Sequence, residues 1–226
     1  MDVDRPGFQI DLAPSDFSEE EVPIPSVTVV EYDLQWPDQF QRIAEKLRSY
    51  LDYCGAKYLV IEHVGSTAVP GLAAKPNIDI TIEVPDARNA EIAKEALIHE
   101  PPPEEHYRCF GDGGIRGRIS MKPHDRSFVP TQSVYIIDTN NTDGRLVMRC
   151  HRALRDTLRM PEHERLKMEY GQIKAELAST SRDGVEYGQS KNPIIRRILR
   201  AAGWTDAEVD EKESLDYRIP GDDLPY

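Results

Sequence analysis

Three residues near the middle of the chain have types that phosphate chemistry uses. Gly65 and Ser66 follow an apolar run, and Asp79 interrupts a β-branched run one short loop later. A glycine lets the backbone approach a phosphate, a serine adds a hydroxyl donor, and the backbone amides of such a turn form a nest that binds anions. A carboxylate facing that nest would hold Mg²⁺, as phosphoryl or nucleotidyl transfer requires. The same residue types also fit an ordinary Gly-Ser turn, with Asp79 as a cap or a surface acid.

Two predicted strands position these groups. The segments KYLVIEHVG (57–65) and NIDITIEV (77–84) have the alternation and β-branched content of strands, and their short connection favours antiparallel neighbours. Side chains two residues apart on a strand point the same way, so Asp79, Thr81 and Glu83 share a polar face and the isoleucines between them share an apolar one. We expect the apolar face to pack on helices and the polar face to meet a ligand or water.

The remaining pattern predicts an α+β domain, in which a small mixed sheet with packed helices is followed by a helical C-terminal half. A helix is expected to open at Trp36-Pro37, because proline suits the first turn and apolar residues recur at helical spacing as far as Leu51. Further strands are expected at 26–33, 107–111, 117–122 and 133–139, and further helices at 85–100, 143–160, 162–179 and 186–202.

The net charge of −12 is concentrated at the two ends of the chain. Residues 1–25 carry seven acids against one arginine, and residues 205–226 carry eight acids against one lysine and one arginine. We therefore expect an acidic N-terminal arm at 1–25 and an acidic C-terminal tail at 205–226, solvated or wrapped on one domain at 26–204. The core between them is balanced, so the charge neither excludes a basic pocket nor supports nucleic-acid binding.

Composition also limits the class of protein. Three scattered cysteines without a C-x-x-C spacing are typical of reduced thiols, and no apolar run approaches the roughly 20 residues of a membrane span. With no signal-like N-terminus, a cytoplasmic location is expected. A basic patch with interleaved aromatic residues is missing, so the expected partner is a small molecule and neither nucleic acid nor a membrane. The oligomeric state is not predicted.

The segment IEHVGSTAVPGLAAKPNIDI (61–80) resembles the signature of the GrpB family, whose members belong to the nucleotidyltransferase superfamily with a polymerase-β-like fold. Further segments resemble the family from about 27 to 204: VEYDLQWPDQF (30–40), LRDTLR (154–159), YGQIKAELA (170–178) and YGQSKNPIIRRILRAAGW (187–204). The resemblance implies that the chain is a divergent member of the family and that its sheet is nucleotidyltransferase-like.

Carried over to this chain, the Gly-Ser pair falls on Gly65 and Ser66 and the first metal-binding aspartate on Asp79, but the second acid falls on Thr81. A two-metal site commonly uses paired carboxylates, so the neutral hydroxyl should weaken Mg²⁺ binding. Glu83 lies on the same face but about 7 Å farther along the strand, which makes it a poor replacement. A histidine-rich strand of the family is replaced by the sequence TQSVY (131–135).

Several other residues have both a functional and an ordinary interpretation. His63 either faces the ligand or makes a structural hydrogen bond, and Lys75 either contacts phosphate or is a solvated loop lysine. Arg152 belongs to an arginine stripe that either lines a cleft for an anion or is solvated. Tyr187 and Lys191 match family positions that would close over the site.

The sequence thus favours an enzyme of nucleotidyltransferase fold that binds a nucleotide or a small anionic metabolite, with nucleotidyl or phosphoryl transfer or carboxylate activation as its chemistry. One alternative is a repurposed cleft doing metal-independent acid/base chemistry, with Tyr135, Glu83 or His63 as candidates. Another is a non-catalytic regulatory module. The candidate catalytic residues are Asp79, Glu83 and His63, the candidate metal ligand is Asp79, and the candidate ligand-binding residues are Gly65, Ser66, Thr67, Lys75, Thr81, Tyr135, Arg152 and Lys191.

Overall fold

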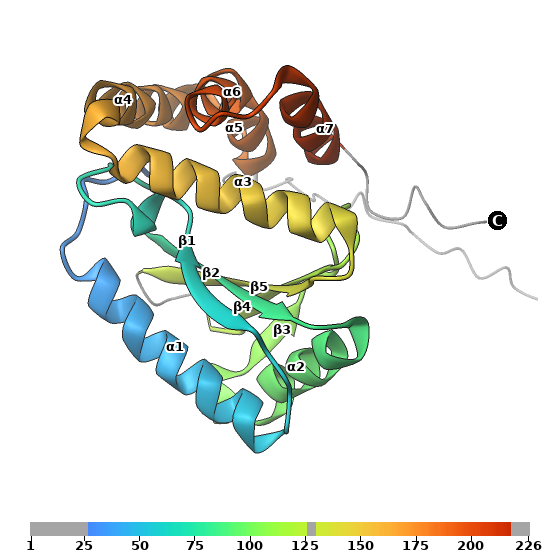
Figure 1. Cartoon of the computed structure of the whole chain (residues 1–226). Coiled ribbons are helices and arrows are strands. Elements are labelled where there is room, and N and C mark those ends of the chain that lie inside the picture. Colours follow the sequence, from blue (N-terminus) through green and yellow to red (C-terminus); the bar gives the residue numbers. More distant parts are fainter. Residues whose placement is uncertain (1–26, 126–129, 218–226) are drawn as a thin grey trace, which may run out of the picture.

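The computed structural model describes residues 27–125 and 130–217. A five-stranded mixed sheet forms its centre, with α1 and α2 on one face and α3 on the other, and α4 to α7 form a further layer above α3 (Figure 1). The strands are β1 (Val60–Val64), β2 (Asn77–Val84), β3 (Tyr107–Cys109), β4 (Arg118–Pro123) and β5 (Thr131–Asp138). The helices are α1 (Trp36–Tyr53), α2 (Ala87–His99), α3 (Thr142–Arg159), α4 (Glu164–Thr180), α5 (Gly184–Ser190), α6 (Asn192–Ala201) and α7 (Asp206–Asp216).

The order of the strands is β1-β2-β5-β4-β3, and only β2 and β5 run parallel. β1 and β2 are antiparallel neighbours with Val64 opposite Asp79, as the short loop between them predicts. On the other side of β2, Asp79 lies opposite Ser133 and Thr81 opposite Tyr135. The predicted α+β class, with a mixed sheet and a helical C-terminal half, is confirmed.

The apolar face of β2 builds the main core. Ile78, Ile80 and Ile82 are fully buried and pack in one cluster with the apolar sides of α1 and α2. In α1 the buried residues recur at intervals of three or four, from Trp36 to Leu51, with proline in the first turn. The local pattern therefore fixes which side of the sheet these two helices cover, and it leaves the side chain of Asp79 on the opposite side.

Two predicted elements differ in the structure. The strand expected at 26–33 is reduced to one bridge between Val30 and Ala74 within the described residues, because this segment meets a loop and has no neighbouring strand to extend the pairing. The helix expected at 186–202 is two helices that meet at Lys191. The arm expected at 1–25 lies outside the described residues.

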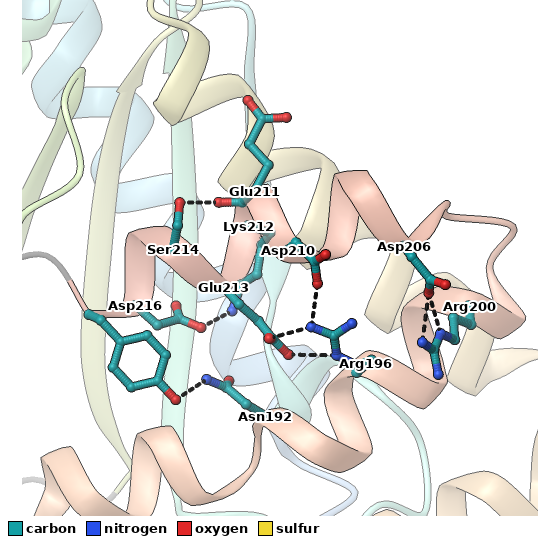
Figure 2. A network of polar contacts seen from close by, with 11 residues as sticks. Asn192, Arg196, Arg200, Asp206, Asp210, Glu211, Lys212, Glu213, Ser214 and Asp216 are labelled. Atoms are coloured by element: carbon teal, nitrogen blue, oxygen red, sulfur yellow. Dashed lines mark hydrogen bonds and ion pairs between the residues drawn. The ribbon is translucent and has the colours of Figure 1, made fainter.

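Part of the acidic C-terminal segment forms α7, which packs against the domain. Thr205 and Glu208 form a capping box at its start, and Val209 is fully buried in a cluster with residues of α3. Figure 2 shows Arg196 of α6 between Asp210 and Glu213 of α7, 2.6 Å from a carboxylate oxygen of each. The acidity of this segment is therefore matched by arginine on the neighbouring helix.

No helix in the described part of the chain combines the length and the apolar composition that a membrane crossing needs.

Candidate functional site

A cavity of about 320 Å³ opens beside the start of β2, on the face away from α1. Its wall includes residues 66, 67 and 75 of the loop, the first residues of β2 and β5, and parts of α4 and α5. Its charged side chains are one carboxylate, Asp79, and four lysines: Lys75, Lys122, Lys174 and Lys191. We call it the lysine cavity. It holds more cationic groups than anionic ones, so its lining favours an anion.

Gly65 allows the carboxylate of Asp79 to lie against the turn after β1. Its φ is +73°, which only glycine adopts readily, and a Cβ built on it would stand 2.4 Å from Oδ2 and 3.1 Å from Cβ of Asp79. Asn77 donates a hydrogen bond of 2.6 Å from Nδ2 to Oδ1 of the same carboxylate. The glycine and the aspartate are therefore parts of one arrangement, and the amide of Asn77 fixes the side chain from the other side.

Ser66 and Thr67 begin a 3-10 turn directly after this glycine, and both line the lysine cavity. Thr67 is buried, and its hydroxyl donates to the carbonyl of Asn77 at 3.0 Å, which ties the two ends of the loop together. Ser66 and Asp79 thus lie in the wall of the same cavity, as the two-strand arrangement predicts.

Basic side chains from the C-terminal half of the chain hold the loop in place. Arg155 donates to the carbonyl of His63 at 3.1 Å, and Arg159 donates twice to the carbonyl of Ala68, at 3.0 and 2.6 Å. Lys174 of α4 donates to the carbonyl of Ala73. These groups are 91 to 101 residues away from their partners in the sequence, so the loop is shaped by tertiary contacts rather than by its own sequence.

Burial moves the pKa values of the charged groups toward one another. It raises the pKa of Asp79 to about 6, although Lys191, Lys75 and Lys122 oppose this shift through their positive charge. Burial also lowers the pKa of Lys191, whose ammonium lies 4.6 Å from the centre of the Tyr187 ring. Each group would be more stable in its charged form if a ligand of opposite sign, or a cation at Asp79, were present.

Lys174 is the most enclosed of the four lysines, with 1% of its surface exposed. Burial, with a smaller effect from the charge of Lys191, lowers its pKa to about 6. Its Nζ lies 4.5 Å from the centre of the Tyr170 ring. An anion in the cavity would favour the protonated form of this amine.

The rest of the polar face of β2 does not meet the cavity, and here the sequence-based expectation was wrong. Thr81 is fully buried, does not line the cavity, and its hydroxyl has no hydrogen-bond partner among the described residues. Glu83 forms an ion pair of 3.0 Å with Arg152 of α3, which also binds Glu62 of β1 at 2.8 Å. Because α3 crosses the sheet at this point, Glu83 and Arg152 are held in a structural pair and do not line the cavity.

His63 points to the opposite face of the sheet and does not line the lysine cavity. Its ring stacks on Phe40 of α1, with centroids 4.8 Å apart, and its Nε2 lies 3.0 Å from the Thr67 hydroxyl. Burial and the charges of Arg159 and Arg155 lower its pKa to about 4, so the ring is neutral at pH 7. The geometry corresponds to the structural hydrogen bond, and His63 positions Thr67.

The model of the GrpB protein family matches residues 26–201. The chain belongs to the GrpB family. A UPF0157 protein of Halalkalibacterium halodurans is 33% identical over 190 residues, which cover 80% of this chain and 84% of that protein. The crystal structure of the conserved protein GrpB from Enterococcus faecalis matches with a TM-score of 0.62 at 30% identity, over 77% of this chain and 96% of that one. A structure of the Cid1 poly(U) polymerase with MgGTP aligns more loosely, with a TM-score of 0.41 at 16% identity, over 67% of this chain and 43% of that one.

Sequence reasoning missed several residues of the site in this GrpB family member. Asn77 is central, because its Oδ1 accepts from the hydroxyls of Thr131 and Ser133, at 2.8 and 3.4 Å, while its Nδ2 holds Asp79. The alternation of β5 contained a signal for Thr131 and Ser133. Both share a face of the strand with Tyr135, which was predicted as a ligand-binding residue and lines the cavity. Lys174 gave a weaker signal: it lies four residues after Tyr170, on the same side of α4.

The donor set of this GrpB family member fits one Mg²⁺ better than two. Asp79 is a single carboxylate, and among the residues that the structure describes no group of three His, Cys, Asp or Glu side chains is placed to hold a metal. Mg²⁺ often binds through one or two carboxylates together with ligand phosphates and water, so Asp79 with a phosphorylated ligand would complete such a site. Thr81 is buried and uncharged, so it does not supply a second carboxylate.

Proposed function

We propose that this GrpB family member is an enzyme that binds a nucleotide or another small anionic metabolite in the lysine cavity. The observation that supports this most is the composition of the cavity, in which four lysines surround one carboxylate. Lys174 is buried and Lys191 is half-buried, and desolvation lowers the pKa of both amines at a cost to their charged forms. An anion would offset that cost and accept hydrogen bonds from the ammonium groups, as phosphate does from lysine.

The proposed chemistry is transfer of a nucleotidyl or phosphoryl group, or activation of a carboxylate, and Asp79 would be the residue that holds one Mg²⁺ for it. The metal would supply charge neutralisation at the phosphate. Ser66 would donate its hydroxyl to the ligand, and Lys191 would stabilise negative charge that develops on it. Asn77 would keep the carboxylate of Asp79 oriented, because its amide already binds Oδ1.

A second candidate is metal-independent acid/base chemistry on a small anionic metabolite. Tyr135 supports it, because it lines the same cavity as Asp79 and the charge of that carboxylate acts on its phenol. Burial and the charge of Asp79 raise the pKa of Tyr135 far above neutrality, so the phenol remains a proton donor. Asp79 would then act as the base, with a pKa of about 6.

Calorimetry with tripolyphosphate and ATP, each with and without Mg²⁺, tests the proposal. We expect Lys191→Gln to weaken the binding of both ligands by about tenfold or more, which is the size of a lost hydrogen bond to a charged group. The matched control is Lys57→Gln, which removes an exposed lysine outside the cavity and should leave both affinities unchanged.

The metal dependence then separates the candidates. An increase of ATP affinity on adding Mg²⁺ that disappears in Asp79→Asn supports the transfer chemistry. Anion binding that is indifferent to Mg²⁺ supports acid/base chemistry if a turnover assay finds activity, and a regulatory module if it does not. Absence of any anion binding by the folded protein would contradict the use of this cavity.

Anion binding should take up protons between pH 7 and pH 9. A bound anion raises the pKa of Lys174 from about 6, so the affinity should rise as the pH falls through this window. A bound anion also raises the pKa of Asp79 from about 6, so this carboxylate adds to the uptake at the lower end of the window. Calorimetry in buffers of different ionisation enthalpy measures the uptake. Lys174→Met should reduce it, and an unchanged uptake in that variant would show that another group binds the proton.

A further inference from the structure

A second cavity, of about 370 Å³, lies on the other face of the sheet, beside α1. Ile43, Tyr50, Tyr107 and Pro123 provide much of its wall, from α1 and from the ends of β3 and β4. We call it the ring cavity. Its size is in the range of small-molecule sites, and its aromatic and aliphatic wall with a few polar groups is typical of them.

The charges around the ring cavity are largely balanced, in contrast to the lysine cavity. Lys46 forms an ion pair of 2.6 Å with Glu105, and the hydroxyl of Tyr50 donates to the other oxygen of the same carboxylate at 3.3 Å. Arg42 adds one positive charge to the wall, and Glu104 and Asp125 add two negative ones, so the lining holds three carboxylates and two cations. An uncharged group therefore suits this cavity better than an anion does.

The two cavities share a wall at the start of β5, because Thr131 and Gln132 line both of them. The hydroxyl of Thr131 donates to Asn77, which in turn binds Asp79 on the lysine side. The amide oxygen of Gln132 accepts from the hydroxyl of Tyr107 on the ring side, at 2.7 Å. A ligand that passes over the start of β5, with an anionic part on one side and an uncharged part on the other, would contact both sets of groups.

Gln39 of α1 places an unsatisfied hydrogen-bond acceptor in the wall of the ring cavity. It lines the cavity, and its Oε1 is buried with no hydrogen-bond partner among the described residues. Buried side-chain oxygens almost always have a donor, supplied by the protein, by water or by a ligand. A ligand with an N–H group on a ring would satisfy this oxygen while its apolar faces contact Ile43 and the tyrosines.

We propose that the ring cavity binds an uncharged nitrogen heterocycle with N–H donors, as the second part of the ligand whose anionic part occupies the lysine cavity. The inference rests on the proposed function, because it assigns the anion to the lysine cavity. It narrows the ligand to molecules that join such a ring to a phosphate or carboxylate group.

The test is calorimetry with ATP, tripolyphosphate and adenosine on four proteins: the wild type, Gln39→Leu, Ile43→Trp and Gln41→Leu. We expect the wild type to bind ATP more tightly than tripolyphosphate. Gln39→Leu removes the acceptor and Ile43→Trp fills the cavity, so each should weaken ATP about tenfold and leave tripolyphosphate within about twofold. Gln41 is exposed on the same helix and does not line the cavity, so Gln41→Leu should change neither affinity. Circular dichroism checks that each variant is folded. If Ile43→Trp does not fold, Gln39→Leu alone tests the proposal.

The outcomes separate the two proposals. Equal affinity of the wild type for ATP and tripolyphosphate, or equal loss of both ligands in Gln39→Leu, would overturn the ring cavity while the lysine cavity stands. If the wild type binds adenosine but not tripolyphosphate, and Gln39→Leu loses the adenosine binding, the proposal for the ring cavity stands and the proposed anion site in the lysine cavity is wrong. Failure of all three ligands to bind would overturn both.

Discussion

Gly65→Ala should lower the free energy of unfolding by about 3 kcal/mol or more. Two effects add at this position. The backbone has φ +73° and ψ −171°, a conformation that is essentially restricted to glycine, and the new methyl group would collide with the Asp79 carboxylate at 2.4 Å. Urea unfolding followed by circular dichroism measures the change.

Gly55→Ala is the matched control for this prediction. Gly55 also has a positive φ, of +66°, but a Cβ there would meet nothing within 4 Å. Its replacement should therefore cost only the backbone term, about 1 to 2 kcal/mol. Equal losses in the two variants would show that the contact between Gly65 and Asp79 adds nothing to the backbone term. A Gly65→Ala protein that is folded should also bind tripolyphosphate and Mg²⁺ less well, because the carboxylate must move.

Asp79→Asn should make the protein more stable at pH 7 while it removes the Mg²⁺ effect on ATP binding. The folded-state pKa of Asp79, about 6, lies above its ordinary value of 3.8, so the folded state binds the proton more tightly. Stability contributed by this group is therefore greatest below pH 3.8 and falls as the pH rises through 6, by up to about 3 kcal/mol. Asparagine mimics the neutral form and should recover part of this loss, reduced by the attraction to Lys191 that it no longer offers.

The measurement is the wild-type free energy of unfolding at several pH values from 4 to 8, compared with that of Asp79→Asn. The difference between the two proteins should grow between pH 4 and pH 6 and then level off. Glu45→Gln, an exposed neutralisation on α1, should show no such growth. An Asp79→Asn protein that is less stable than the wild type at pH 7 would mean that the lysines stabilise the carboxylate more than burial destabilises it. Functional groups often make a protein less stable than it would be without them.

The fold followed from the sequence where the pattern was local. The alternation of β2, the short loop to β1 and the spacing of apolar residues in α1 predicted their pairing and the buried face, and the structure confirms both. Register also placed Asp79 beside the end of β1, which is why the Gly-Ser step and the aspartate could be assigned to one cavity.

The rest of the candidate site could not be derived in this way, because it depends on what covers each face. Alternation predicted that Thr81 and Glu83 share the face of Asp79, but it cannot show that α3 crosses that face and buries them. Lys174 enters the cavity from a helix about one hundred residues away from the loop that it contacts. The motif left His63 open between a ligand contact and a structural hydrogen bond, and only the packing of its ring on Phe40, beside the Thr67 hydroxyl, distinguishes the two.

The contacts that fasten the loop have a consequence for how the molecule is made. The sheet and its first two helices are synthesised before Arg155, Arg159 and Lys174, whose bonds to the loop span 91 to 101 residues. Contacts between such distant parts of a chain form late, since closing a long segment costs entropy before any bond is gained. A nascent chain that ends before α3 would therefore contain Ser66 and Asp79 without a cavity, and the capacity to bind a ligand would mark the completion of folding.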